Sequence, residues 1–160
     1  MLLKTLSFFT PHTLTPTPYR AFMKHNIARL RPKKYIKQEK AVPRIDVDLF
    51  AQSSSQKLNI LQNAFNELKG DEPRVTSIES YYDDDGKDRI LNIEIASLGN
   101  YTFKVIHSDQ VLYLLSPISG VNKYCFDEGE SRWVCNKDSH ILDELLVRET
   151  IGNTKGYLKL

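Results

Sequence analysis

The spacing of apolar residues predicts a long helix in the first half of the chain. Between about Phe50 and Lys69, apolar residues recur at steps of three and four, which is the period of a helix with one buried face. Gly70 and Pro73 follow directly and are expected to end the helix. One side of this helix must therefore lie against another layer of structure.

A second, shorter apolar stripe lies near the end of the chain. We expect Asn136 or Ser139 to cap this helix, because either side chain can accept a hydrogen bond from a backbone N–H of the first turn. Asp143 and Glu144 fall in the first turns, where carboxylates are favourable, and the helix should end near Gly152. Its apolar face is formed by Ile141, Leu142, Leu145 and Leu146.

Six segments between the two helices are predicted to be β-strands. They are rich in β-branched and aromatic residues, and short connections with Gly, Asp, Ser or Pro separate them, as hairpins require. The segments are VTSIESYY (75–82), RILNIEI (89–95), GNYTFKVI (99–106), QVLYLLS (110–116), VNKYCF (121–126) and SRWVC (131–135). This order predicts an α+β fold, a two-layer sandwich with both helices packed on one face of an antiparallel sheet. The core is expected to contain Leu58, Leu61, Phe65, Leu68, Ile93, Phe103, Val105, Leu142, Leu145 and Leu146.

Charge is distributed unevenly and divides the chain into parts. Residues 1–40 hold nine Lys or Arg and one acid, a charge of +8, whereas the remainder holds 13 Lys or Arg and 19 Asp or Glu, a charge of −6. The first 40 residues are therefore predicted to be a mitochondrial targeting segment or, alternatively, a retained basic arm. A folded domain over 46–152 and a short tail over 153–160 follow. The basic cluster of the arm contains Arg29, Arg31, Lys33, Lys34 and Lys37.

The sequence offers few candidates for catalytic chemistry. None of its four histidines has a spacing that suggests a base with an orienting carboxylate, and Ser116 lacks the glycine of a nucleophile elbow. Cys125 and Cys135 are expected to be thiols, paired or unpaired, packed in a hairpin, because the other usual zinc ligands are not spaced around them. An enzyme that works alone is therefore not expected.

The acidic turn DDDGKD (83–88) permits two interpretations. It fits a hairpin in which Asp85 and Gly86 make the turn, and it does not fit the spacing of an EF-hand loop. If the chain binds iron, the best candidates are four acids beside the first strand. They are Glu79, Asp83, Asp84 and Asp85.

Several runs of residues, taken in order, resemble the frataxin family. The runs are LGNYTFKV, YLLSPISGVNKYCF, RW and HILDELL. Family members carry a Leu-Gly-Thr-Tyr strand, a Trp-Leu-Ser-Ser-Pro-Ser-Ser-Gly-Pro-Lys-Arg-Tyr-Asp-Trp run, a second Trp and a Leu-His-Glu-Leu-Leu helix. The spacing from Pro117 through Gly120 to Tyr124 fits without gaps, and the resemblance covers about residues 46–150.

The resemblance implies a mitochondrial matrix protein that binds iron weakly through carboxylates. It also implies docking on the cysteine desulfurase and scaffold complex that builds iron–sulfur clusters. Two surfaces carry this role in the family, an acidic ridge along the first helix and first strand, and the exposed face of the sheet. The residues that match this face are Asp109, Tyr113, Lys123 and Trp133. The chain departs from the family in having Tyr113 for a Trp, Lys123 for an Arg, and only Glu67 as an acid inside the first helix.

Two functions are therefore consistent with the sequence. The first is an accessory protein of iron–sulfur cluster assembly, either without catalytic activity or with weakly bound iron as its cofactor. The second is a frataxin-fold structural subunit of a large mitochondrial assembly, such as the ribosome or a respiratory complex, whose basic arm contacts RNA or a neighbouring subunit. The depleted acids favour the second function, and the family resemblance favours the first.

Overall fold

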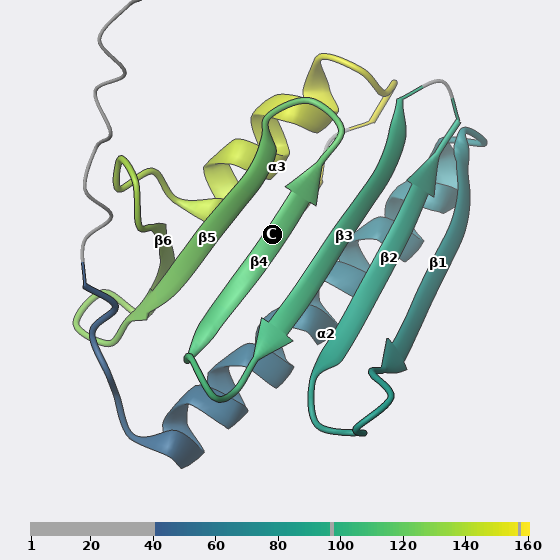
Figure 1. The fold of residues 1–160 in the computed structure, drawn as a ribbon. Coiled ribbons are helices and arrows are strands. Elements are labelled where there is room, and N and C mark those ends of the chain that lie inside the picture. The colour runs from purple at the N-terminus through teal and green to yellow at the C-terminus, as the bar shows by residue number, and fades with distance from the viewer. Residues whose placement is uncertain (1–40, 97, 157) are drawn as a thin grey trace, which may run out of the picture. The chain divides into compact units, whose positions relative to one another are not determined.

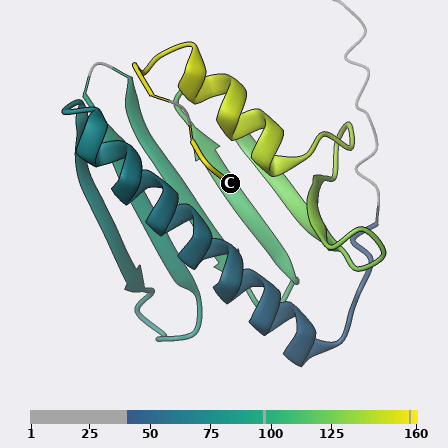
Figure 2. The same ribbon diagram turned by 180° about the vertical axis from the view of Figure 1, so that it is seen from behind.

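The computed structural model describes residues 41–96, 98–156 and 158–160, and it has the two layers that the sequence predicts. Six strands form one layer, and two helices lie behind it in Figure 1 and in front of it in Figure 2. In chain order the elements are α2 (Val47–Asp71), β1 (Val75–Tyr82), β2 (Arg89–Ile95), β3 (Gly99–Ile106), β4 (Val111–Ser116), β5 (Gly120–Asp127), β6 (Arg132–Cys135) and α3 (Leu142–Ile151).

The sheet is a simple antiparallel meander. Its strands are ordered β1 to β6, and each strand pairs with its neighbours in sequence. Because side chains alternate along a strand, one face points toward the helices and the other away from them. The helix-side face forms the core, and we call the opposite face the open face. Register places these residues on the open face: Glu79, Ile90, Asn92, Thr102, Lys104, Tyr113, Leu115, Val121 and Lys123.

All ten predicted core residues are buried in one cluster between the helices and the sheet. The largest fully buried side chains also include Tyr101, Tyr124 and Phe50, which the apolar pattern did not single out as core. Both tyrosines lie on the helix-side face of their strands, where Tyr101 pairs with the predicted core residue Ile93 and Tyr124 pairs with the buried Leu112. Tyrosine was missed because its hydroxyl makes it ambiguous between core and surface.

The first helix is longer than its apolar stripe, because its ends depend on polar groups. It begins at Val47, where the Asp46 carboxylate accepts hydrogen bonds from the backbone N–H groups of Asp48 (2.9 Å) and Leu49 (3.1 Å). It ends at Asp71, after which Glu72 is extended. An N-cap aspartate of this kind satisfies two donors that the helix itself leaves unpaired.

The predicted caps of the second helix are wrong. Neither Asn136 nor Ser139 caps α3, which begins at Leu142 after Ile141 and has no side-chain cap. The intervening residues form a closed loop, in which the Cys135 N–H donates to the His140 carbonyl at 2.8 Å. A β-bridge between Val134 and Ile141 keeps the chain extended up to that point, so the helix cannot start earlier.

The C-terminal residues belong to the fold and are not a free tail. They run back between the two helices (Figure 2), where Leu158 is buried in the core. Glu72, itself 1% exposed, holds this segment: its carboxylate accepts the Lys155 N–H at 2.8 Å and a two-pronged contact from Arg74. The hydrogen bonds from Arg74, and then that from Lys155, lower the Glu72 pKa to about 2.

Candidate functional site

Tyr113 and Lys123 meet at the centre of the open face. They are direct cross-strand partners in β4 and β5, and the Lys123 ammonium lies 5.9 Å from the centroid of the Tyr113 ring. Both side chains are partly exposed. A lysine over a tyrosine face is a favourable cation–π pair, which holds the ring in one place before any partner arrives. Two of the four residues expected on this face are thus brought together.

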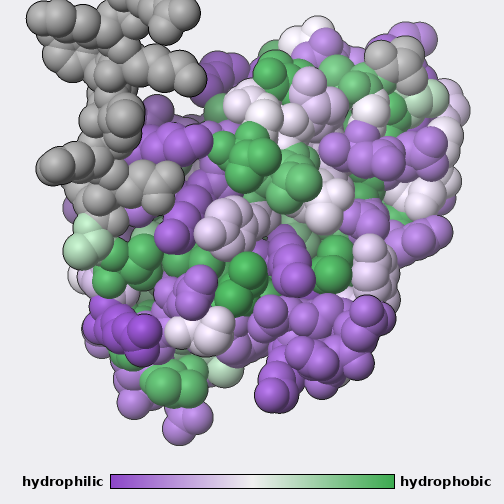
Figure 3. All heavy atoms as spheres, in the orientation of Figure 1, coloured by the Kyte–Doolittle hydropathy of each residue, from purple (hydrophilic) through white to green (hydrophobic). Residues whose placement is uncertain are grey.

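Exposed apolar residues lie next to this pair, at the end of the open face where β4 turns into β5. Leu115, Ile118 and Val121 are 43%, 47% and 55% exposed, and Leu115 pairs directly with Val121. Figure 3 shows hydrophobic spheres gathered over this end of β4 and β5. An apolar patch rimmed by polar groups is typical of a protein-binding surface.

In the turn beside this patch, the Pro117 side chain packs closely over Gly99. Gly99 has φ +118°, and a side-chain carbon placed there would lie 3.1 Å from the Cβ atom of Pro117. The Leu-Gly and Ser-Pro runs of the family resemblance therefore meet in space, although they lie far apart in the sequence. Glycine permits both the unusual φ and the approach of Pro117.

The structure does not place Trp133 on the open face, so the prediction that it contributes to that surface is wrong. Trp133 is 4% exposed and packs on the helix side, with its ring centroid 5.8 Å from that of Phe50 and 5.4 Å from that of Phe126. Alternation along β6 points it toward α2. Asp109 lies in the exposed β3–β4 turn, where it accepts a hydrogen bond from the Ser108 hydroxyl at 3.2 Å.

The four acids proposed as an iron site do not converge. Asp83 accepts the backbone N–H groups of Lys87 and Asp88, both at 3.2 Å, and lies 4.0 Å from the Lys104 ammonium. Hydrogen bonds from the backbone of this turn lower the pKa of Asp83. Glu79 lies four residues earlier along β1, about 13 Å away at the rise of a strand. Only Asp84 and Asp85 extend into solvent without such ties.

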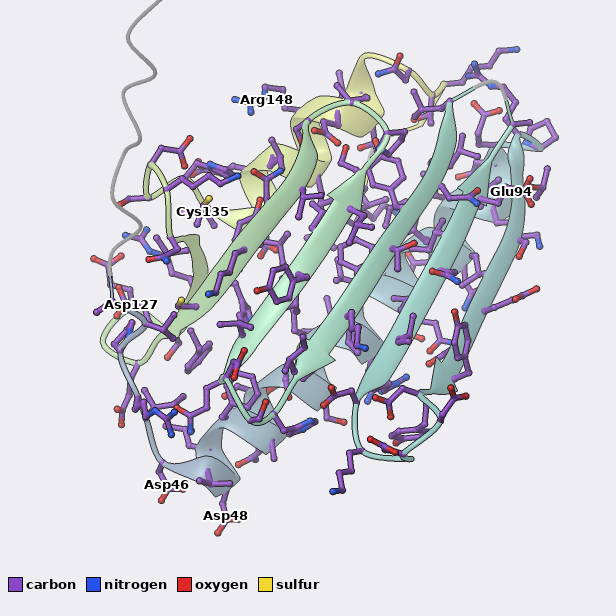
Figure 4. All side chains as sticks on the ribbon, in the orientation of Figure 1. Asp46, Asp48, Glu94, Asp127, Cys135 and Arg148 are labelled. Carbon is purple, nitrogen blue, oxygen red and sulfur yellow. The ribbon has the colours of Figure 1, made fainter. Side chains whose placement is uncertain are left out.

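The ends of the first helix supply no better cation site. Asp46 is used as the N-cap and Glu72 as the anchor of the C-terminal segment, so both carboxylates already have partners. Figure 4 shows Asp46 and Asp48 together at the beginning of the helix. A hard cation needs several free oxygens around one point, and two adjacent carboxylates, one of them capping, do not provide that.

A different cluster of ligand-type residues lies in the loop between β6 and α3. Cys135, Asp138 and His140 place their ligating atoms within 4.8 Å of one another, and they are the one such group among the residues described. The His140 Nδ1 atom lies 2.5 Å from the Asp138 carboxylate, and its Nε2 atom lies 2.7 Å from the Tyr124 hydroxyl.

Sequence reasoning missed this cluster. It judged the cysteines against the usual zinc spacings and found no carboxylate placed to orient a histidine, and the short interval from Cys135 to His140 was the available sign. The expectation that the histidines lack an orienting carboxylate is wrong at His140, and also at His107, whose Nδ1 atom lies 3.4 Å from Asp88. Both cysteines are buried and unpaired with each other, which decides between the two states that the sequence left open.

Burial and hydrogen bonding set the ionisation of the loop. Burial, and then the hydrogen bond that the thiol donates to the Asp138 carboxylate, raise the pKa of Cys135. For Asp138, partial burial raises the pKa, but hydrogen bonds from His140 and Cys135 outweigh it and leave the pKa lowered. The loop thus holds one carboxylate between two hydrogen-bond donors.

The basic arm falls outside the part of the chain that the structure describes. This concerns Arg29, Arg31, Lys33, Lys34 and Lys37. Within the described residues, neither helix is both long enough and apolar enough to span a membrane.

Comparison with known proteins identifies the same fold family that the sequence motifs and the structure indicate. The family model of the frataxin-like domain matches residues 43–156, and the chain belongs to this family. The mitochondrial frataxin of Dictyostelium discoideum is 32% identical over 65 residues, which are 41% of this chain and 34% of that protein. The chain thus spans about a third of the length of the curated relative that it matches.

Two solved structures share the fold. Trimeric frataxin from the yeast Saccharomyces cerevisiae, with its full-length N-terminus, has a TM-score of 0.52 and 20% identity, and the match covers 79% of this chain and 87% of that one. The same yeast protein complexed with ferrous iron has a TM-score of 0.50 and 20% identity, with 74% and 93% covered. At this level of identity the likeness establishes the fold, an α+β sandwich, and leaves the function to be argued from the residues.

Proposed function

We propose that this protein is a mitochondrial accessory factor of iron–sulfur cluster assembly, which docks on the cysteine desulfurase and scaffold complex through its open face. The observation that carries the proposal is the pairing of Tyr113 with Lys123 beside the exposed Leu115 and Val121, on the sheet face opposite the two described helices. A large ring with a polar tip, next to an apolar patch, is the composition of a binding hot spot. Mitochondrial frataxin of Dictyostelium supports a location in mitochondria, and we propose the matrix or the matrix side of the inner membrane.

The proposal is tested by measuring the affinity of the full-length chain for a purified desulfurase–scaffold complex. Tyr113→Ala should weaken binding at least about tenfold, the effect of losing a hot-spot residue. Tyr82→Ala is the matched control, because Tyr82 is 61% exposed and lies next to Tyr81 in β1, on the opposite side of the strand from the open face. Circular dichroism establishes that each variant is folded. Equal affinity of the Tyr113→Ala variant and the parent would contradict docking through this face.

Iron binding by this chain is proposed only as a weak interaction at the β1–β2 turn. Of the four candidate acids, Asp84 and Asp85 are exposed. Asp83 instead accepts backbone hydrogen bonds within the turn, and Glu79 lies about four residues away along β1. Two adjacent carboxylates attract a hard cation without enclosing it. Titration of Fe²⁺ against the double variant Asp84→Asn, Asp85→Asn should remove what binding the parent shows, and unchanged binding would place the iron elsewhere.

The charge of the first 40 residues favours one other function, that of a structural subunit in a large mitochondrial assembly. A segment with a charge of +8 ahead of an acidic domain suits contact with RNA phosphates or an acidic neighbour. The size of the native protein distinguishes the two. A small species that co-purifies with a cysteine desulfurase supports the assembly factor, and a chain that keeps these residues and occurs only in a megadalton particle supports the subunit.

A further inference from the structure

The loop between β6 and α3 gathers three different ligand types at one place. The Cys135 sulfur, a carboxylate oxygen of Asp138 and a ring nitrogen of His140 lie within 4.8 Å of one another. Figure 4 shows Cys135 at the β6 side of the sheet, where the chain leads into this loop. Ligands of one tetrahedral ion lie about 3 to 4 Å apart, as bond lengths of about 2.0 to 2.3 Å require, so only small side-chain shifts are needed.

The backbone holds these side chains in position without help from a ligand. The Cys135 N–H donates to the His140 carbonyl at 2.8 Å, and the Ser139 N–H donates to the Cys135 carbonyl at 2.9 Å. The Asn136 N–H donates to the Lys123 carbonyl of β5 at 2.9 Å, which ties the loop to the sheet. A binding constellation that is fixed in advance loses little conformational entropy when an ion arrives.

Tyr124 orients His140 through the ring nitrogen that faces away from Asp138. Its hydroxyl lies 2.7 Å from His140 Nε2, and its ring meets the imidazole edge to face at 5.4 Å between centroids. Tyr124 is fully buried and cannot move away. Without a metal, the Nδ1–H group of His140 donates to Asp138, and Nε2 accepts from the Tyr124 hydroxyl. When Nδ1 binds an ion, the imidazole proton moves to Nε2, which then donates to this hydroxyl. Metal-binding histidines are usually held in this way, by a hydrogen bond from the nitrogen that does not bind the metal.

We propose that Cys135, Asp138 and His140 bind a divalent transition-metal cation of the Zn²⁺ type, with Tyr124 as the positioning residue. Mixed sulfur, nitrogen and oxygen donors suit Zn²⁺ and not the hard cations that carboxylates alone select. The Cys135 sulfur loses its proton to solvent as the metal–sulfur bond forms, and thiolate and carboxylate together neutralise the two positive charges of the ion. A fourth position is left for water or a partner's ligand, since Asp138 is exposed.

The loop borders a surface hollow. Cys135 is 1% exposed, and it contributes to the lining of a hollow of about 480 Å³ together with Asn136 and Ser139. Asp138 is exposed, so an ion meets the loop first at this carboxylate. Hydrogen bonds among Asp138, His140 and Tyr124 would be enough to close the loop in a purely structural role. Such a role needs no thiol, so the presence of Cys135 beside them favours a metal.

The experiment uses the reduced, full-length protein and Co²⁺ as a spectroscopic probe, with Zn²⁺ as competitor. We expect one saturable equivalent, a cobalt–thiolate charge-transfer band in the near ultraviolet, and loss of that band on adding Zn²⁺. Cys135→Ser should abolish the band, and His140→Gln and Asp138→Asn should each weaken binding about tenfold to hundredfold. Tyr124→Phe should weaken it less and leave the stoichiometry unchanged. Cys125→Ser is the matched control and should keep both band and affinity.

Three results would overturn the proposal. They are the absence of a thiolate band, a band that persists in Cys135→Ser, and parental affinity in both His140→Gln and Asp138→Asn, which would mean that a thiol alone collects the ion. Circular dichroism checks the fold of each variant, and the exposed Asp138 provides a variant that should fold whatever happens at the buried cysteine. The outcome is independent of docking on the desulfurase complex, because Cys135, Asp138, His140 and Tyr124 all lie away from the open face.

Discussion

Replacing Trp133 with alanine should destabilise the fold strongly. The side chain is 4% exposed and fills the space between α2 and the β5–β6 hairpin, in contact with Phe50 and Phe126. A tryptophan buries about 150–250 Å², which at about 25 cal/mol per Å² corresponds to roughly 4–6 kcal/mol. That value is an upper bound, because the unfolded chain also buries apolar surface. Since β6 is an edge strand whose neighbours can partly close the cavity, we expect a loss of about 3–4 kcal/mol.

The assay is urea unfolding followed by far-ultraviolet circular dichroism, because Trp133 is the only tryptophan and its removal abolishes the intrinsic tryptophan fluorescence. Trp133→Phe should lose less, since a ring remains against Phe50. Tyr82→Ala, at a residue 61% exposed, should change the free energy of unfolding by less than about 1 kcal/mol. A Trp133→Ala variant within 1 kcal/mol of the parent would refute the reasoning and return Trp133 to the surface.

Two further perturbations test other parts of the fold. Because the Glu72 pKa is lowered from 4.5 to about 2 in the folded protein, the stability it contributes is complete above pH 4.5 and is lost as pH falls toward 2. Glu72→Gln should therefore flatten the stability–pH curve in that window, measured by thermal unfolding at each pH. Gly99→Ala should cost about 1–3 kcal/mol in urea unfolding, because alanine disfavours φ +118° and meets Pro117, and an unchanged midpoint would contradict this contact.

The contacts between family-specific residues show which features local sequence can predict and which it cannot. The runs around Gly99 and Pro117 were recognised separately, and the resemblance placed both in a frataxin fold. The pairing of β3 with β4 was needed to show that Gly99 and Pro117 are in contact. It was also needed to show that this close packing requires a glycine at position 99. The same holds for Tyr113 and Lys123, whose cross-strand contact depends on the register between two strands.

Sequence by itself determined the order of elements, the layers and the core. Hydrophobic period is a local property, so Leu58, Leu61 and Phe65 could be assigned to a buried helix face without knowledge of their partners. Tertiary structure alone decided which face Trp133 occupies, that Glu72 anchors the C-terminal segment, and that His140 meets Tyr124. These depend on strand register, loop closure and long-range hydrogen bonds, which join residues whose sequence neighbours carry no trace of the contact.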